Sequence, residues 1–198
     1  GTMNPDVIDY AGPIDPEVGV IGAWDEAGKL IGVGVNYACH ATTSPGGISA
    51  NWIYYLERTI QGALGTDAPV VFLQGACGDI TQVDNLAQYA RPGNEQWAHR
   101  VGGRVGAEAV RTLLLVEPGN NLSVAAEQKV WKINRRRPSR EHSKKALADI
   151  QGDPGKVARH DQIFAKEILM LEALIEKDPA VEVEVQAIQI GPAVFLTT

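Results

Sequence analysis

Apolar residues near the start of the chain gather in two short stretches, and their pattern predicts a β-hairpin. The stretches are VGVIGAW (residues 18–24) and LIGVGVNYAC (30–39), with the turn-like sequence DEAGK between them. The second stretch is apolar at most positions, which is typical of a largely buried strand. Residues 4–20 are rich in proline and acidic residues and predict an extended, turn-rich lead-in.

The next segments alternate between helix and strand patterns. Trp52, Leu56 and Ile60 recur at helical spacing and predict a helix within residues 48–64, which Ser49 or Asn51 can cap. The sequence APVVFLQG (68–75) predicts a second short strand, and it leads into the small-residue loop GACGDIT (75–81).

A second amphipathic helix is predicted around residues 97–115. Trp97, Val101, Val105 and Ala109 are spaced by four, so they lie on one face of a helix. Glycines at 102, 103 and 106 would allow another backbone to approach closely, at a cost in helix propensity.

The second half of the chain repeats the mixture of strands and helices. Residues 122–133 predict a strand pair or one long strand, and a charged helical region runs from about 143 to 177 with an interruption at GDPG. VEVEVQAIQI (181–190) alternates as a strand does, GP makes a turn, and AVFLTT (193–198) begins another strand. Because the chain stops on a strand of the buried type, we expect it to be part of a larger domain.

Together these elements predict the α/β class, with a mixed β-sheet packed against helices and incomplete at its C-terminal strand. We expect residues 1–198 to form one partial catalytic domain. In α/β sheets, ligands bind beyond the carboxyl ends of the strands. His40 and the loop 75–81 each follow a predicted strand, so they would meet at one edge if the two strands are parallel neighbours.

Composition and charge exclude some functions. The 198 residues carry a formal net charge of -6, and the isoelectric point is about 5.2, so the chain as a whole is not basic enough to bind nucleic acid. Its one basic cluster is KINRRRPSR (132–140). We therefore predict no nucleic-acid partner. No apolar run reaches the roughly 20 residues of a membrane helix. The first ten residues lack a signal-peptide pattern, which leaves the compartment undetermined.

The two cysteines lie in apolar surroundings without CxxC spacing, and the simplest interpretation is two small buried hydrophobic residues. Adjacent strand residues point to opposite faces, so Cys39 and His40 cannot form a nucleophile and base pair. A pair between His40 and Cys77 stays geometrically open. His40 is either a metal ligand, for which a neutral imidazole at a strand end is suitable, or a hydrogen-bonded structural histidine.

The loop 75–81 also has two interpretations. Glycines such as Gly75 and Gly78 let backbone N–H groups face a substrate, and Asp79 and Thr81 add a carboxylate and a hydroxyl, which together suit an oxyanion-type pocket. The same residues also suit a tight turn in which Asp79 caps the chain that follows.

The order of five segments resembles the amino-terminal catalytic domain of the neutral/alkaline non-lysosomal ceramidase family. These segments are NPDVIDYAGPIDPEVGV, VNYACHATTS, ISANWIYYLE, VVFLQGACGDITQ and VQAIQIGPAVFL. The bacterial ceramidase-like members look most similar. The resemblance implies hydrolysis of ceramide amide bonds by an enzyme whose zinc is held by two histidines, a glutamate and a tyrosine.

The resemblance also assigns residues. His40 matches the second zinc histidine, and Asp79 and Thr81 match the aspartate and serine of a segment that lines the site. Asn51 and Tyr54 stand where the family has aspartate and glycine, on the side of the site where substrate binds. The first histidine would lie upstream of residue 4 and the glutamate just after residue 198, so the resemblance implies one zinc ligand of four in this chain.

Our first hypothesis is therefore an inactive fragment of a zinc-dependent amide hydrolase that acts on N-acylsphingosine or a related small-molecule or lipid amide. Zinc is expected in the complete protein and absent or weakly bound here. The alternative is a non-catalytic, ceramidase-like binding or scaffold domain that has lost its metal centre. The open sheet edge would also allow the chain to pair with a second copy of itself. If the upstream region carries a signal peptide, the protein would be secreted or periplasmic.

Overall fold

A computed structural model describes residues 4–119, 122–153 and 155–197. The chain forms two compact units, Gly1–Gly119 and Asn120–Thr198, and each contains one three-stranded sheet. The predicted α/β class is confirmed, although the strands are divided between two sheets. The predicted single domain over residues 1–198 stays a prediction, because two compact units can belong to one catalytic domain.

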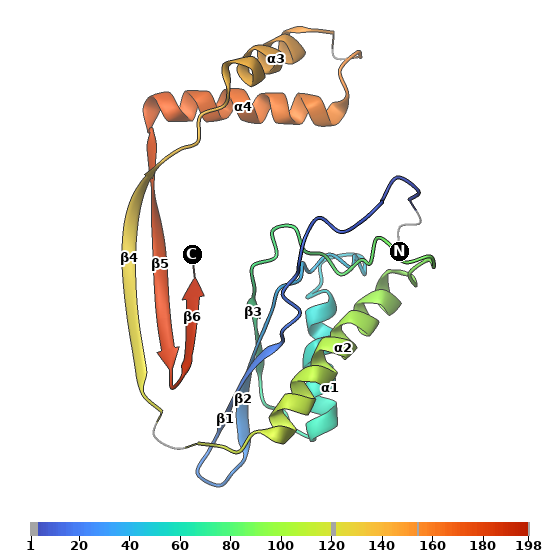
Figure 1. The fold of residues 1–198 in the computed structure, drawn as a ribbon, viewed down its shortest axis with the longest axis vertical. Coiled ribbons are helices and arrows are strands. Elements are labelled where there is room, and N and C mark those ends of the chain that lie inside the picture. The colour runs from blue at the N-terminus through green and yellow to red at the C-terminus, as the bar shows by residue number, and fades with distance from the viewer. Residues whose placement is uncertain (1–3, 120–121, 154, 198) are drawn as a thin grey trace. The chain divides into compact units, whose positions relative to one another are not determined.

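The first unit is a mixed sheet with helices on one face (Figure 1). β1 and β2 pair antiparallel, as the hairpin pattern predicted, and β2 pairs parallel with β3. Helices α1 and α2 pack against each other beside this sheet. The bounds are β1 Gly19–Trp24, β2 Leu30–Tyr37, α1 Trp52–Leu64, β3 Val70–Gln74 and α2 Asn94–Leu115.

The core of this unit lies between the sheet and the two helices. Trp52 is fully buried, and its ring meets the ring of Phe72 edge to face at 5.0 Å. A Cβ atom on Gly102 would lie 2.1 Å from the Trp52 carbonyl oxygen, so α1 and α2 approach at a position that only glycine allows. The sequence predicted this close approach for Gly102, Gly103 and Gly106. It is confirmed for Gly102 and Gly106 and is wrong for Gly103, where an added Cβ atom would meet only the Thr59 hydroxyl at 3.9 Å.

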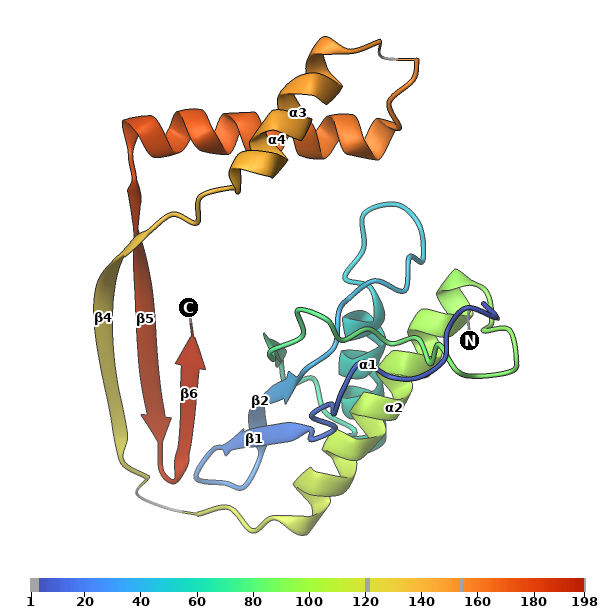
Figure 2. The same cartoon turned by 45° about the horizontal axis from the view of Figure 1, so that its top comes forward.

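The second unit is an antiparallel sheet with a helical hairpin between its first two strands. β4 is one long strand that pairs with β5 over its full length, and Figure 2 shows α3 crossing α4 at the end of this ribbon. Every residue of β4 is exposed. The bounds are β4 Val124–Asn134, α3 Arg140–Gln151, α4 Arg159–Lys177, β5 Ala180–Ile190 and β6 Ala193–Thr197.

Candidate functional site

Two loops leave the same end of the first sheet, and they carry the residues that the sequence singled out. Because β2 and β3 are parallel neighbours, the segment after Tyr37 and the segment after Gln74 start side by side (Figure 2). The backbone N–H of His40 donates to the Ile80 carbonyl at 3.2 Å. The predicted meeting of His40 with the loop 75–81 is therefore confirmed.

The backbone of His40 is held firmly in this position. Its carbonyl oxygen accepts a hydrogen bond from the buried Trp52 ring nitrogen at 3.0 Å. Its N–H and its ring both contact the carbonyl oxygen of Ile80. An element of the core and a loop from the neighbouring strand thus fix where the imidazole lies.

The hydrogen bond of the His40 ring determines which ring nitrogen keeps a lone pair for a metal ion. Nδ1 lies 2.9 Å from the Ile80 carbonyl oxygen, and a carbonyl oxygen can only accept, so Nδ1 donates this bond. In the neutral ring the proton is then on Nδ1, and Nε2 keeps its lone pair. Histidines that bind metals in proteins are commonly oriented by a bond of this kind on the other nitrogen. His40 is partly buried. The lone pair on its Nε2 is what a nitrogen needs to bind a metal ion.

Among residues 4–119, 122–153 and 155–197, no group of three or more His, Cys, Asp or Glu side chains could hold a metal ion, so His40 belongs to no such group. A catalytic zinc is normally fixed by three protein ligands. The described residues therefore fit the role of one zinc ligand and do not make a complete zinc site.

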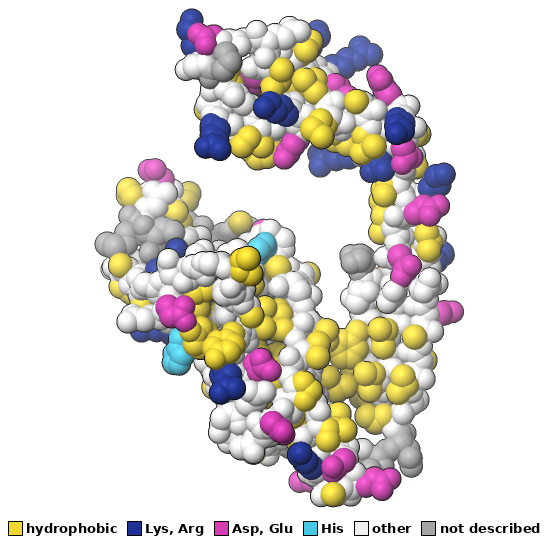
Figure 3. Space-filling view, turned by 180° about the vertical axis from the view of Figure 1, so that it is seen from behind, with side chains coloured by type: hydrophobic (Ala, Val, Ile, Leu, Met, Phe, Trp, Pro, Cys, Tyr) yellow, Lys and Arg dark blue, Asp and Glu magenta, His cyan; other side chains and the backbone are white. Residues whose placement is uncertain are grey.

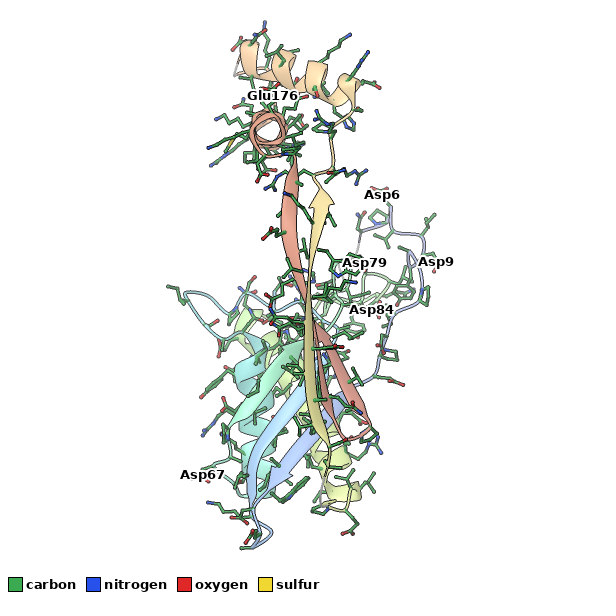
Figure 4. The ribbon with its side chains drawn as sticks, turned by 90° about the vertical axis from the view of Figure 1, so that its left-hand side faces the viewer. Asp6, Asp9, Asp67, Asp79, Asp84 and Glu176 are labelled. Carbon is green, nitrogen blue, oxygen red and sulfur yellow. The ribbon has the colours of Figure 1, made fainter. Side chains whose placement is uncertain are left out.

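The loop 75–81 forms a tight turn at this end of the sheet. The Ile80 N–H donates to the Cys77 carbonyl at 3.0 Å, which places Gly78 and Asp79 at the tip of the turn. Gly75 already donates its N–H to Tyr37 at 3.0 Å. Asp79 is exposed, and Figure 4 shows it at the opposite end of the sheet from Asp67. The tight turn is thus present, Asp79 presents its carboxylate to solvent, and the oxyanion-type pocket stays a prediction.

The Thr81 hydroxyl lies next to this turn and bonds within the chain. It donates to the Gln82 side-chain oxygen at 2.8 Å, and the Thr42 hydroxyl donates to the same oxygen at 3.1 Å. This bridge joins the loop after β2 to the loop after β3. The side-chain amide of Gln82 thus links the two loops.

Asn51, predicted on the substrate side, is the N-cap of α1. Its side-chain oxygen accepts from the Trp52 N–H at 3.0 Å and from the Thr43 N–H at 3.1 Å, and also from the Thr43 hydroxyl. Its φ of 59° is in the left-handed region, which asparagine tolerates better than most residues. Asn51 therefore has a demanding structural role, and its role in binding substrate stays a prediction.

A shallow hollow adjoins this cap. It has a volume of about 300 Å³, and Asn51, Ser49, Tyr54 and Tyr55 lie along it. A second hollow of about 510 Å³ continues past Tyr55, whose ring meets the His99 ring edge to face at 5.1 Å. Sequence reasoning missed both hollows. The adjacent Tyr54 and Tyr55 at the start of a helix were the available signal.

The cysteines differ from each other. Cys39 is buried as predicted, and burial, followed by the nearby Cys77, raises the pKa of its thiol to about 11. Cys77 is partly exposed, so the prediction of burial is wrong for it. β2 ends at Tyr37, so the strand argument for separating Cys39 from His40 does not apply. The Cys39 thiol instead lies 3.7 Å from the carbonyl oxygen of His40.

Comparison with known proteins identifies one similar fold. No protein family and no curated protein matches the sequence. A crystal structure of neutral ceramidase from Pseudomonas aeruginosa matches with a TM-score of 0.62 at 15% identity, over 98% of this chain and 36% of that chain. At this identity the likeness shows the fold alone. The chain has a ceramidase-like fold and spans little more than a third of the neighbour's length.

Proposed function

We propose that this chain is part of a ceramidase-like zinc amide hydrolase that cleaves N-acylsphingosines or related amides. The observation that supports the proposal is the bond from His40 Nδ1 to the Ile80 carbonyl, which leaves Nε2 as a metal ligand at the carboxyl end of a parallel strand pair. The ceramidase-like fold and the five sequence segments support the same assignment.

In this proposal the chain supplies one ligand and one wall of the site. Zinc, when bound, would polarise the amide carbonyl and lower the pKa of a bound water. His40 holds the metal through Nε2, and Asp79 and Thr81, on and beside the turn, face the substrate. The remaining ligands have to come from elsewhere in the natural protein, so the 198 residues alone are expected to be inactive.

Measuring metal content and amide hydrolysis tests this assignment. We expect the natural protein that carries this sequence to contain stoichiometric zinc and to hydrolyse a short-chain N-acylsphingosine, and the 198-residue chain to do neither. His40→Ala in the natural protein should abolish hydrolysis, whereas His142→Ala, on the exposed surface of α3, should leave it unchanged. Full activity after His40→Ala would overturn the proposal.

A non-catalytic, ceramidase-like binding domain is the second candidate. It is favoured by Asn51 and Thr81, because both side chains are already hydrogen-bonded within the chain. This candidate predicts that the natural protein binds an N-acylsphingosine without cleaving it and that His40→Ala leaves binding intact. Product formation by the wild-type protein would exclude it.

A further inference from the structure

The second unit holds a strong local excess of positive charge that the proposed hydrolase site does not use. Between residues 129 and 145 the only acidic residue is Glu141, although the whole chain has a formal net charge of -6. We call this stretch, which covers the end of β4, the connecting loop and the first half of α3, the basic segment. Its cationic residues are Lys129, Lys132, Arg135, Arg136, Arg137, Arg140, Lys144 and Lys145.

Most of these cations face solvent. Arg135 is bonded to the Asp178 carboxylate at 3.2 Å, and Lys145 is paired with Asp149 on the next turn of α3. In the part of the chain that the structure describes, no ion pair involves Arg136, Arg137 or Lys144, and all three are exposed. Their charge is therefore available to an anionic partner.

The helical hairpin that follows exposes large apolar side chains. On α4, Ile163, Met170 and Leu174 share one helix face by their spacing and are 49%, 71% and 41% exposed. Lys166 and Lys177 lie beside this face at helical spacing, and so does one acidic residue, Glu167. Figure 3 shows hydrophobic side chains next to Lys and Arg side chains along this hairpin. An apolar helix face with lysines beside it is typical of helices that lie in a membrane interface.

α3 carries the same combination. Arg140, Lys144 and Leu147 are spaced by four and three residues, so they share one face of the helix, and all three are exposed. The hydroxyl of Ser143 donates to Glu172, which joins the first turn of α3 to α4. The basic segment and the exposed apolar face are thus parts of one packed hairpin.

From this combination we infer that the α3–α4 hairpin and the basic segment dock onto a membrane surface rich in anionic phospholipid. Lipid phosphates and serine headgroups complement the arginines, and the acyl boundary takes up Ile163, Met170 and Leu174. A nucleic acid would satisfy the charge alone, because its phosphate backbone offers no partner for exposed isoleucine and methionine. The inference does not depend on the hydrolase proposal, since none of these residues belongs to the His40 site.

Vesicle co-sedimentation of the 198-residue chain tests the inference. The probes are phosphatidylcholine vesicles and phosphatidylcholine vesicles that contain about one third phosphatidylserine. We expect binding to the second kind alone, and weaker binding as salt screens the headgroups. Arg136→Gln/Arg137→Gln removes two charges worth about 1 kcal/mol each near such a surface, so it should weaken binding about 30-fold.

Two further variants separate charge from apolar contact. Ile163→Ser/Met170→Ser should weaken binding to the anionic vesicles at least tenfold while keeping the circular dichroism spectrum, because both side chains are exposed. Arg91→Gln/Arg104→Gln removes the same charge from exposed positions of the first unit and should change nothing. Absence of vesicle binding, equal binding by all variants, or tighter binding to duplex DNA than to anionic vesicles would overturn the inference.

Discussion

The two units are built from the same parts and bury them to very different extents. Each has three strands and two helices among its described residues. In the first unit the helices cover one face of the sheet and enclose a core that contains the fully buried Trp52, Leu56 and Ile60. In the second unit the helices pack against each other, and β4 is exposed along its whole length.

Sequence patterns that form helices and strands therefore do not always form a packed core. The first unit has apolar residues at the right period on both its sheet and its helices, so the two surfaces interlock. The second unit has the right periods, but among its described residues the buried apolar ones are Ala146, Ala165 and Ile175, all on the helices. We therefore expect most of the stability to come from the first unit.

Two tryptophan substitutions give the largest expected contrast. Trp52→Ala removes a ring that is 0% exposed and should lower the free energy of unfolding by roughly 3–5 kcal/mol. Trp131→Ala removes a ring that is 49% exposed and meets the Lys129 ammonium at 4.1 Å, so it should cost about 0.5 kcal/mol. Urea unfolding followed by circular dichroism measures both. Equal losses would contradict the proposed difference between the units.

Two glycine substitutions on α2 test the close helix contact at a smaller scale. Gly102→Ala places a Cβ atom 2.1 Å from the Trp52 carbonyl oxygen, so α1 must move, at a cost of about 3 kcal/mol. Gly103→Ala meets only the Thr59 hydroxyl at 3.9 Å and should stabilise the helix by up to about 1 kcal/mol. Urea unfolding measures both changes in the free energy of unfolding. If Gly102→Ala is as stable as the wild-type chain, then α1 and α2 are farther apart than the structure has them.

Much of this fold could be predicted from sequence because its signals are local. The spacing of Trp52, Leu56 and Ile60 predicts a helix without knowledge of its partner. The small residues at 102 and 106 likewise predict a close contact, because a missing side chain is visible in the sequence. The meeting of His40 with the loop 75–81 followed from two strands and one rule about parallel sheets.

The parts that the sequence did not predict depend on loop geometry. The sequence proposed Asn51 as one of two possible caps, and the structure confirms it. The φ of 59° and the bond from a threonine eight residues earlier in the chain could not be predicted from any pattern. The bond from the His40 ring to Ile80 depends on how a turn four residues long is placed. The prediction that AVFLTT (193–198) forms a strand of the buried type is wrong for the described residues, because most of β6 is exposed.

The cysteines give the smallest and most specific contrast. Because the pKa of Cys39 is raised to about 11, about 0.1% of that thiol is ionised at pH 8, and it is buried as well. Iodoacetamide at pH 8 should therefore modify Cys77 in the folded chain and Cys39 only after unfolding, as mass spectrometry would show. Rapid labelling of Cys39 in the folded chain would contradict its placement.

The raised pKa of Cys39 also predicts a pH dependence of stability. The folded chain favours the neutral thiol, so this contribution is fully present below pH 9 and is lost as the pH rises from about 9 to about 11. Cys39→Ala should remove that dependence, and Cys77→Ala should keep most of it, because burial is the larger cause of the raised pKa of Cys39. Urea midpoints across this pH range provide the measurement.

The proposed function depends on His40 binding a metal through Nε2. Long-range proton–nitrogen correlation spectra of the imidazole test it directly, because they show which ring nitrogen carries the proton. We expect a neutral His40 protonated on Nδ1, with the Nε2 resonance shifting when zinc is added in excess. A neutral His40 protonated on Nε2 and unchanged by zinc would contradict its role as a metal ligand.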